Sequence, residues 1–160
     1  RDASSDAMAS FEFVKRFDEV NGILADVPRF AQVLSTRNPE VVVISPGPLD
    51  VRRAIPVRDF KRSLHLMLDL VRLKDPEIRV VLVSPPPLPT NVKLSNVYRA
   101  AVSDLAEEAR VGFVDIHTPL DGPDMFSFFS THLDDGVFLA YPNDAGQEII
   151  ANAILKALKK

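Results

Sequence analysis

Residues 80–87 read VVLVSPPP, and this stretch decides the fold class. Four consecutive apolar residues, three of them β-branched, are typical of a strand that is buried on both faces. Residues 41–44, VVVI, have the same pattern, and residues 111–116, VGFVDI, form a third apolar run. Strands buried on both faces usually belong to parallel sheets that are covered by helices. The three runs therefore predict a parallel sheet.

Helical patterns separate and follow the three runs. Apolar residues recur at helical spacing in three intervals, namely Phe60, Leu64, Met67 and Val71, then Leu94, Val97, Ala101, Leu105 and Ala109, then Ile149, Ile150, Ala153, Ile154, Ala157 and Leu158. Strands that alternate with helices pair in parallel through right-handed crossovers. The sequence therefore predicts an α/β domain.

The first 39 residues also have apolar residues at helical spacing, but this pattern is less regular than in the three later intervals. Phe13, Phe17, Val20 and Leu24 form one apolar stripe. Pro28, with Asp26 as a cap, predicts a second short helix that ends near residue 38. No strand signal of comparable strength precedes the first run. We therefore expect one domain over residues 1–160, with a helical part at 1–39 and a β/α core at 40–160.

The composition excludes several classes of protein. The chain has 160 residues, of which 46% are hydrophobic and 26% charged, as in an average globular domain. A net charge of −3 argues against a nucleic-acid partner. No apolar run approaches the roughly 20 residues that a membrane-spanning helix needs. Cysteine is absent, which excludes disulfides and thiolate chemistry, and we expect neither a metal nor another cofactor. The sequence predicts no particular cellular compartment.

Candidate functional residues follow the predicted strands. Ligands of open parallel sheets bind outside the carboxyl ends of the strands. The polar residues expected there are Ser45, Asp50, Ser84, His117, His132, Asp134, Asp135, Tyr141 and Asn143. Residues 117–141 show no periodicity and are long for a connection, which is typical of a functional loop. Asn143 is expected to cap the last helix, and His117 to satisfy a turn or a helix cap.

The order of these pieces resembles the SGNH, or GDSL, hydrolase family. The resemblance rests on VVLVSPPP, on FVDIHTPL at 113–120 and on DDGVFLAYPNDAGQEIIANAIL at 134–155, and it covers residues 41–158. It implies a three-layer α/β/α, flavodoxin-like fold. It also implies ester or acyl hydrolysis by a Ser nucleophile and a His base, with an Asp three residues before the His. In that family the oxyanion is held by the Ser amide, a Gly, and the Asn of a Gly-x-Asn-Asp turn.

The family's site residues transfer only in part. Gly47-Pro48-Leu49-Asp50 occupies the Gly-x-Asn-Asp turn, but Leu49 has no donor, and losing one oxyanion donor typically slows the reaction about a hundred- to a thousandfold. Asp135 matches the family's Asp, whereas Phe138 and Tyr141 stand near Pro142 where the His is expected. A tyrosine ordinarily has a pKa of about 10 and is no base at neutral pH. His132 is the candidate for a substitute base.

The nucleophile motif Gly-Asp-Ser occurs nowhere in these residues, and Ser4 lies nearer the position of the family's Gly donor. The first hypothesis is an SGNH-hydrolase-like domain without esterase activity of its own, which serves in structure, interaction or binding. The second is an active ester or carbohydrate-ester hydrolase whose nucleophile segment lies outside the chain. The third is a binding module for a small ester or sugar. In the family sheet the nucleophile strand lies beside residues 41–44, so we expect the first strands to be missing, and another segment or subunit to cover this edge.

Overall fold

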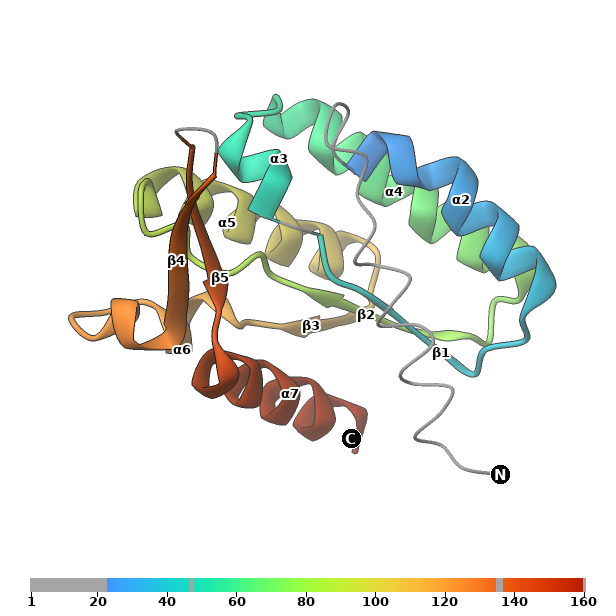
Figure 1. Ribbon diagram of the computed structural model, residues 1–160. Helices are drawn as coiled ribbons and strands as arrows, with labels where there is room; N and C mark the ends of the chain where they lie inside the picture. The colour runs from blue at the N-terminus through green and yellow to red at the C-terminus, as the bar shows by residue number, and fades with distance from the viewer. Residues whose placement is uncertain (1–22, 47, 135–136, 160) are drawn as a thin grey trace.

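The computed structural model describes residues 23–46, 48–134 and 137–159. Its centre is a parallel sheet of three strands in the order β1 (Val41–Ile44), β2 (Arg79–Val83) and β3 (Gly112–Val114) (Figure 1). Val42 lies opposite Val80, and Leu82 lies opposite Phe113. The predicted parallel sheet is therefore confirmed, although β3 is shorter than the apolar run suggested.

Helices cover both faces of this sheet. The helices α2 (Ile23–Thr36), α4 (Val57–Lys74) and α5 (Val92–Glu108) lie over one face, and α7 (Asp144–Leu158) lies over the other (Figure 1). Strand residues alternate in direction, so β2 sends Val80 and Leu82 into one core and Val81 and Val83 into the other. This arrangement explains the unbroken apolar run and confirms the three-layer, flavodoxin-like class.

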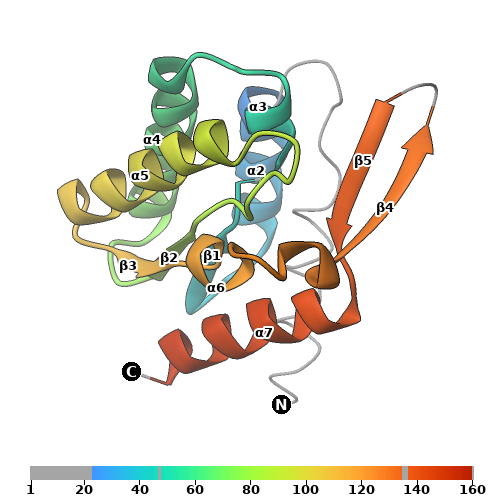
Figure 2. The ribbon, with the colours of Figure 1, turned by 90° about the vertical axis from the view of Figure 1, so that its left-hand side faces the viewer.

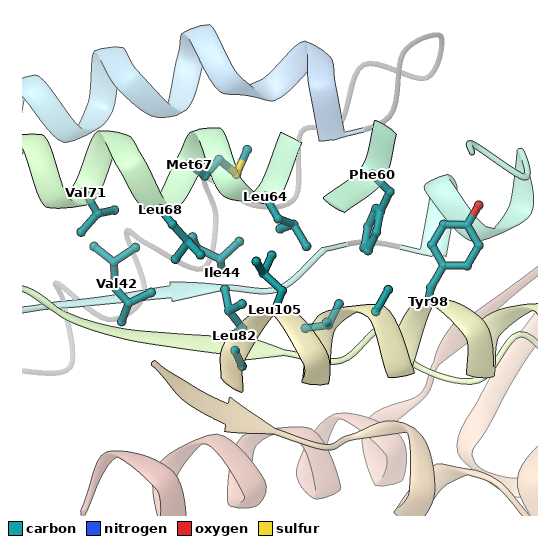
Figure 3. Close-up of a cluster of buried hydrophobic side chains, with 14 of the residues drawn as sticks. Val42, Ile44, Phe60, Leu64, Met67, Leu68, Val71, Leu82, Tyr98 and Leu105 are labelled. Atoms are coloured by element: carbon teal, nitrogen blue, oxygen red, sulfur yellow. The ribbon is translucent and has the colours of Figure 1, made fainter. Parts of the chain in front are cut away.

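The larger core lies between β1, β2 and α4. Figure 3 shows Leu64 and Val71 of α4 pointing toward the sheet, whereas Met67 points away from it. All three are buried in the core, as the helical spacing predicted. Phe60 begins the same stripe and meets the ring of Tyr98 edge to face at 5.0 Å between centroids. Burial of one such side chain stabilises the fold by about 1.5–3 kcal/mol, so this core holds α4 on the sheet.

The apolar face of α5 differs from the prediction at one position. Val97 is half-exposed, and the neighbouring Tyr98 is buried instead. The ring of Tyr98 packs on Phe60, and its hydroxyl donates to the backbone carbonyl of Ile55. An aromatic ring with a satisfied hydroxyl buries more apolar area than valine, so Tyr98 sets the rotation of α5.

The N-terminal prediction was wrong about helix boundaries. Pro28 lies inside α2, which begins at Ile23, and therefore does not open a second helix. Proline near the start of a helix removes one hydrogen bond, and packing of Val27 and Phe30 against the larger core compensates for that loss. The apolar stripe at Phe13, Phe17 and Val20 lies outside the described residues.

The segment after β3 is not the predicted loop. It contains α6 (His117–Leu120), the 3-10 helix η1 (Met125–Phe128), and the antiparallel hairpin of β4 (Phe129–Asp134) and β5 (Val137–Pro142). Figure 2 shows the hairpin standing away from the parallel sheet. The sequence signal for this hairpin was Asp135-Gly136, a dipeptide typical of tight turns, between two β-prone runs.

The start of α7 fixes the hairpin to the domain. As predicted, Asn143 caps the helix, because its side-chain oxygen accepts from the Gly146 amide at 3.1 Å. The Asn143 side-chain amide donates to the Ser127 carbonyl at 2.7 Å. A Cβ on Gly146 would lie 2.4 Å from the Phe128 carbonyl oxygen, so only glycine permits this approach.

None of the described helices has the length and apolarity to cross a membrane.

Candidate functional site

Three polar positions follow the carboxyl ends of the strands, and Figure 2 views this end of the sheet. Ser45 follows β1, Ser84 follows β2 and Asp115 follows β3. The short helix α3 (Pro48–Arg52) leaves β1, and α6 leaves β3. The two edges of the sheet therefore carry two separate groups of polar residues.

Near β1, Asp50 is fully buried within α3. Its backbone carbonyl accepts from the Ile55 amide at 3.0 Å, and the carbonyl of Ile55 accepts from the Tyr98 hydroxyl. Burial raises the pKa of Tyr98, and the nearby Asp50 carboxylate raises it further. Tyr98 therefore stays protonated and ties the turn after β1 to α5.

A cation–π contact joins α3 to the hairpin. The guanidinium carbon of Arg52 lies 5.7 Å from the ring centroid of Tyr141, which is 43% exposed. The Nε and Nη2 atoms of Arg52 are buried and have no hydrogen-bond partner among the described residues. A guanidinium over an aromatic ring is attracted electrostatically to the ring face. The structure thus brings the residue before Pro142 to the helix that contains Asp50.

The other residues predicted from the family resemblance are His132, Ser4, Gly47 and Asp135. The backbone of His132 lies in β4 opposite Leu139, two residues along the strand from the pair of Ser130 with Tyr141. Ser4, Gly47 and Asp135 lie outside the described residues. Among the predicted site residues, the structure therefore connects Asp50 and Tyr141 through α3 and Arg52, and it joins Ser84 to the His117 amide at the other edge of the sheet.

At the other edge, Asp115 is the centre of a dense hydrogen-bond network. Arg99 donates to its Oδ2 through Nε at 2.9 Å and Nη2 at 2.7 Å, and the Thr118 hydroxyl donates to the same oxygen at 2.7 Å. The amides of His117 and Thr118 donate to Oδ1 at 2.9 and 3.1 Å. Asp115 therefore receives the first amides of α6 as well as the guanidinium of α5.

These contacts set the protonation state of Asp115. Burial alone would raise the pKa of this carboxyl, but the hydrogen bonds from Arg99 and Thr118 outweigh burial and hold the pKa well below its ordinary value. The same pair raises the pKa of Arg99, chiefly through the hydrogen bond to Asp115. The carboxylate is thus a fixed anion whose charge Arg99 neutralises.

Ser84 joins β2 to this network. Its hydroxyl is fully buried and accepts from the Ile116 amide at 2.9 Å and the His117 amide at 3.1 Å. It also donates to the Asp115 Oδ1 at 3.3 Å. A hydroxyl engaged in this way fixes the turn after β3 and has no lone pair directed at a substrate.

Ser95 and His117 form a serine–histidine pair that the sequence did not reveal. The Ser95 hydroxyl lies 3.1 Å from the His117 Nε2, within hydrogen-bond reach of a nucleophile and its base. The hydroxyl is fully buried, however, donates to the Val92 carbonyl at 2.9 Å and accepts from the Leu88 amide at 3.1 Å. This pattern leaves Ser95 to accept from a protonated Nε2. The pair is therefore a structural bridge and no activated nucleophile.

The chain's parallel sheet between helices, with a hairpin and a capped last helix beyond the carboxyl ends of the strands, defines a three-layer α/β/α domain of the flavodoxin-like class. The chain belongs to the GDSL-like lipase/acylhydrolase family, with which it matches over residues 15–149. No curated protein has a sequence that matches this chain.

Solved structures agree with this assignment at the level of the fold. An acetylxylan esterase from Geobacillus stearothermophilus has a TM-score of 0.65 and 20% identity, over 88% of this chain and 68% of that one. A GDSL-like lipase from Bacteroides thetaiotaomicron has a TM-score of 0.64 and 21% identity, over 83% and 68%. The OSK domain of Drosophila Oskar has a TM-score of 0.60 and 18% identity, over 78% of this chain and 65% of that one. The chain thus spans about two thirds of the length of these structures.

Proposed function

We propose that this SGNH-hydrolase-like domain does not hydrolyse esters by itself and serves as a structural, interaction or binding domain. The observation that carries the proposal is the contact between Arg52 and Tyr141. Tyr141 stands directly before Pro142 and the helix cap Asn143, and it is with Phe138 one of the two residues found where the family resemblance calls for a histidine base. Its phenol ring packs against a guanidinium, which gives it a role in joining the hairpin to α3.

Two further features support the proposal. Leu49 replaces the asparagine of the family's turn, so this position supplies no side-chain donor to an oxyanion. The one described serine–histidine pair, Ser95 with His117, is closed by hydrogen bonds to Val92 and Leu88. Acyl transfer needs an accessible hydroxyl, a base and oxyanion donors that converge on one point.

Ester hydrolysis tests the proposal. The purified chain is assayed with p-nitrophenyl acetate and with an acetylated xylan, as are His132→Ala, which removes the substitute base, and His65→Ala as a matched control on an exposed helix face. We expect turnover equal to the uncatalysed rate in all three proteins. Turnover by the original chain that His132→Ala abolishes and His65→Ala retains would overturn the proposal. Activity confined to a longer native product would favour the alternative of an active hydrolase completed by another segment.

We also propose that another segment or subunit covers the edge of β1 that faces away from β2, where no strand of the described residues pairs with it. The Glu40 carbonyl accepts from the Arg79 amide, which turns the backbone groups of Val42 and Ile44 toward β2. The amides and carbonyls of Val41 and Val43 consequently face away from β2. An apolar strand whose backbone groups face outward on one side is a template for pairing with another strand.

Hydrogen exchange of single amides tests this coverage. In the native product we expect the amides of Val41 and Val43 to exchange as slowly as those of Val42 and Ile44, which bond to β2 and serve as internal controls. Rapid exchange at Val41 and Val43 beside slow exchange at Val42 and Ile44 would show an open edge and contradict the proposal.

A further inference from the structure

We propose that a hollow between α5 and α6 binds a small zwitterion, a molecule with one carboxylate and one ammonium group of the amino-acid type. The hollow measures about 380 Å³ and is lined by Val92, Lys93, Asn96, Arg99, His117, Thr118, Asp121 and Gly122. It lies beyond the carboxyl end of β3, across β2 from β1 and α3. The inference is independent of whether the domain hydrolyses esters.

One wall of the hollow is positively charged. It comes from the first turns of α5, whose helix dipole favours an anion. Lys93 and Asn96 line it, and Lys93 forms no ion pair within the described part of the chain. Arg99 also reaches the hollow, but Asp115 already binds its Nε and Nη2 and neutralises its charge. This wall therefore presents a single uncompensated cation together with an amide donor.

The opposite wall presents acceptors. Asp121 follows α6, is exposed, and has no ion pair with any described residue. Asp121 also lines the hollow, so its carboxylate brings an anion there that no described cation neutralises, in addition to the Lys93 cation. A ligand with only a negative charge would be repelled from this wall, and a ligand with only a positive charge would be repelled from the other.

His117 gives the hollow a fixed acceptor. The residue is only 2% exposed, and Ser95 holds its Nε2 at 3.1 Å. Its Nδ1 makes no hydrogen bond to any residue that the structure describes. Burial lowers the pKa of His117, and the carboxylates of Asp121 and Asp115 oppose this effect only in part. The imidazole is thus neutral near pH 7, and Nδ1 offers a lone pair to an N–H donor.

The charges and acceptors define the orientation of the ligand. A carboxylate fits between Lys93 and the Asn96 amide, and an ammonium fits between the Asp121 carboxylate and the His117 Nδ1. Each charged group of the ligand then meets an opposite charge and a directional hydrogen-bond partner. Binding of both halves together is expected to exceed binding of either half alone.

Nuclear magnetic resonance of the full chain tests the site with three probes at constant pH and ionic strength. L-alanine carries both charges, acetate only the negative one and ethylammonium only the positive one. We expect L-alanine to shift the backbone amides of Lys93, Asn96, Thr118 and Gly122 saturably, with a Kd at least tenfold below that of acetate or ethylammonium. Shifts that do not saturate, or equal affinity for L-alanine and acetate, would overturn the proposal.

Three variants test which side chains of the hollow contribute to binding. Asp121→Asn removes the anion, and His117→Gln keeps an N–H donor for Ser95 while it removes the Nδ1 acceptor; each is expected to weaken L-alanine binding at least fivefold. Asp104→Asn is the matched control, because Asp104 is exposed on α5 and lines a different hollow. An equal loss in Asp104→Asn and Asp121→Asn would reduce the effect to net charge and contradict the site. Circular dichroism checks that each variant is folded.

Discussion

The two edges of the parallel sheet differ in what their polar residues do. Beyond β3, Asp115, Arg99, Thr118 and Ser84 bind one another closely, and the turn into α6 depends on them. Beyond β1, where the family resemblance places the oxyanion turn, Arg52 packs on the ring of Tyr141. One edge thus resembles an active site in composition but is built for stability. The other edge has the position of an active site and carries a packing contact.

A large number of polar residues at one edge of the sheet is therefore a poor guide to the position of a catalytic site. The Asp115 carboxylate and the Ser95 hydroxyl both have their hydrogen-bonding capacity used by the protein itself. Groups that are satisfied internally stabilise a fold but cannot activate a substrate without breaking a bond. Substitutions at the two edges should therefore affect different properties.

Asp115→Ala should have the largest effect on stability. The change leaves the Arg99 guanidinium, the Thr118 hydroxyl and two amides of α6 without their acceptor. We expect the free energy of unfolding to fall by about 2–4 kcal/mol, measured by urea denaturation at pH 7. Asp69→Ala is the matched control, because Asp69 is exposed on α4. Equal losses in the two variants would show that the network contributes no stability.

The free energy of unfolding should depend on pH through the protonation of His117. This effect should be smaller than that of Asp115→Ala. Burial lowers its pKa in the folded protein below the ordinary value of 6.5, so the unfolded chain binds a proton first. This contribution to stability is fully present above about pH 6.5, and it is lost as the pH falls from there through the folded pKa.

Urea denaturation between pH 7.5 and 5 measures this dependence. We expect His117→Gln to remove the decline in the free energy of unfolding below pH 6.5, because glutamine does not titrate. His65→Gln, on the exposed face of α4, should retain the decline. A decline that persists unchanged in His117→Gln would contradict the assignment of this pH dependence to the buried imidazole.

The sequence predicted the sheet and most of its helices because burial on both faces leaves a strong pattern. Val80 to Val83 are apolar without interruption since successive residues enter two different cores. Asn143 was equally predictable, because capping depends on neighbouring residues. Such local or periodic causes are visible in one sequence.

The candidate site was less predictable because its contacts join distant parts of the chain. Ser95 and Arg99 lie one helical turn apart on α5, and only the packing of α5 against α6 brings them to His117 and Asp115. Nothing near Arg52 in the sequence indicated that it would cover Tyr141. The hairpin was missed because β4, FSTHLD, mixes polar and apolar residues without a clear strand pattern, although Asp135-Gly136, a dipeptide typical of tight turns, stands between the two strands in the sequence.

Loss of the contact between Arg52 and Tyr141 should have the smallest effect on the free energy of unfolding. A double-mutant cycle can isolate the contribution of this contact. Tyr141→Leu removes the ring, and Arg52→Met keeps an apolar stem without the charge. We expect a coupling free energy of about 0.5–1 kcal/mol between the two sites, since Tyr141 is partly exposed.

Tyr141→Phe separates the ring from its hydroxyl and completes the comparison of the two edges. A cation–π contact depends on the ring face, so the Tyr141→Phe variant should keep most of the coupling that Tyr141→Leu loses. A coupling that disappears equally in Tyr141→Phe would assign the interaction to the phenol oxygen. Tyr141 would then act through a polar group, as the residues beyond β3 do, and the contrast between the two edges would fail.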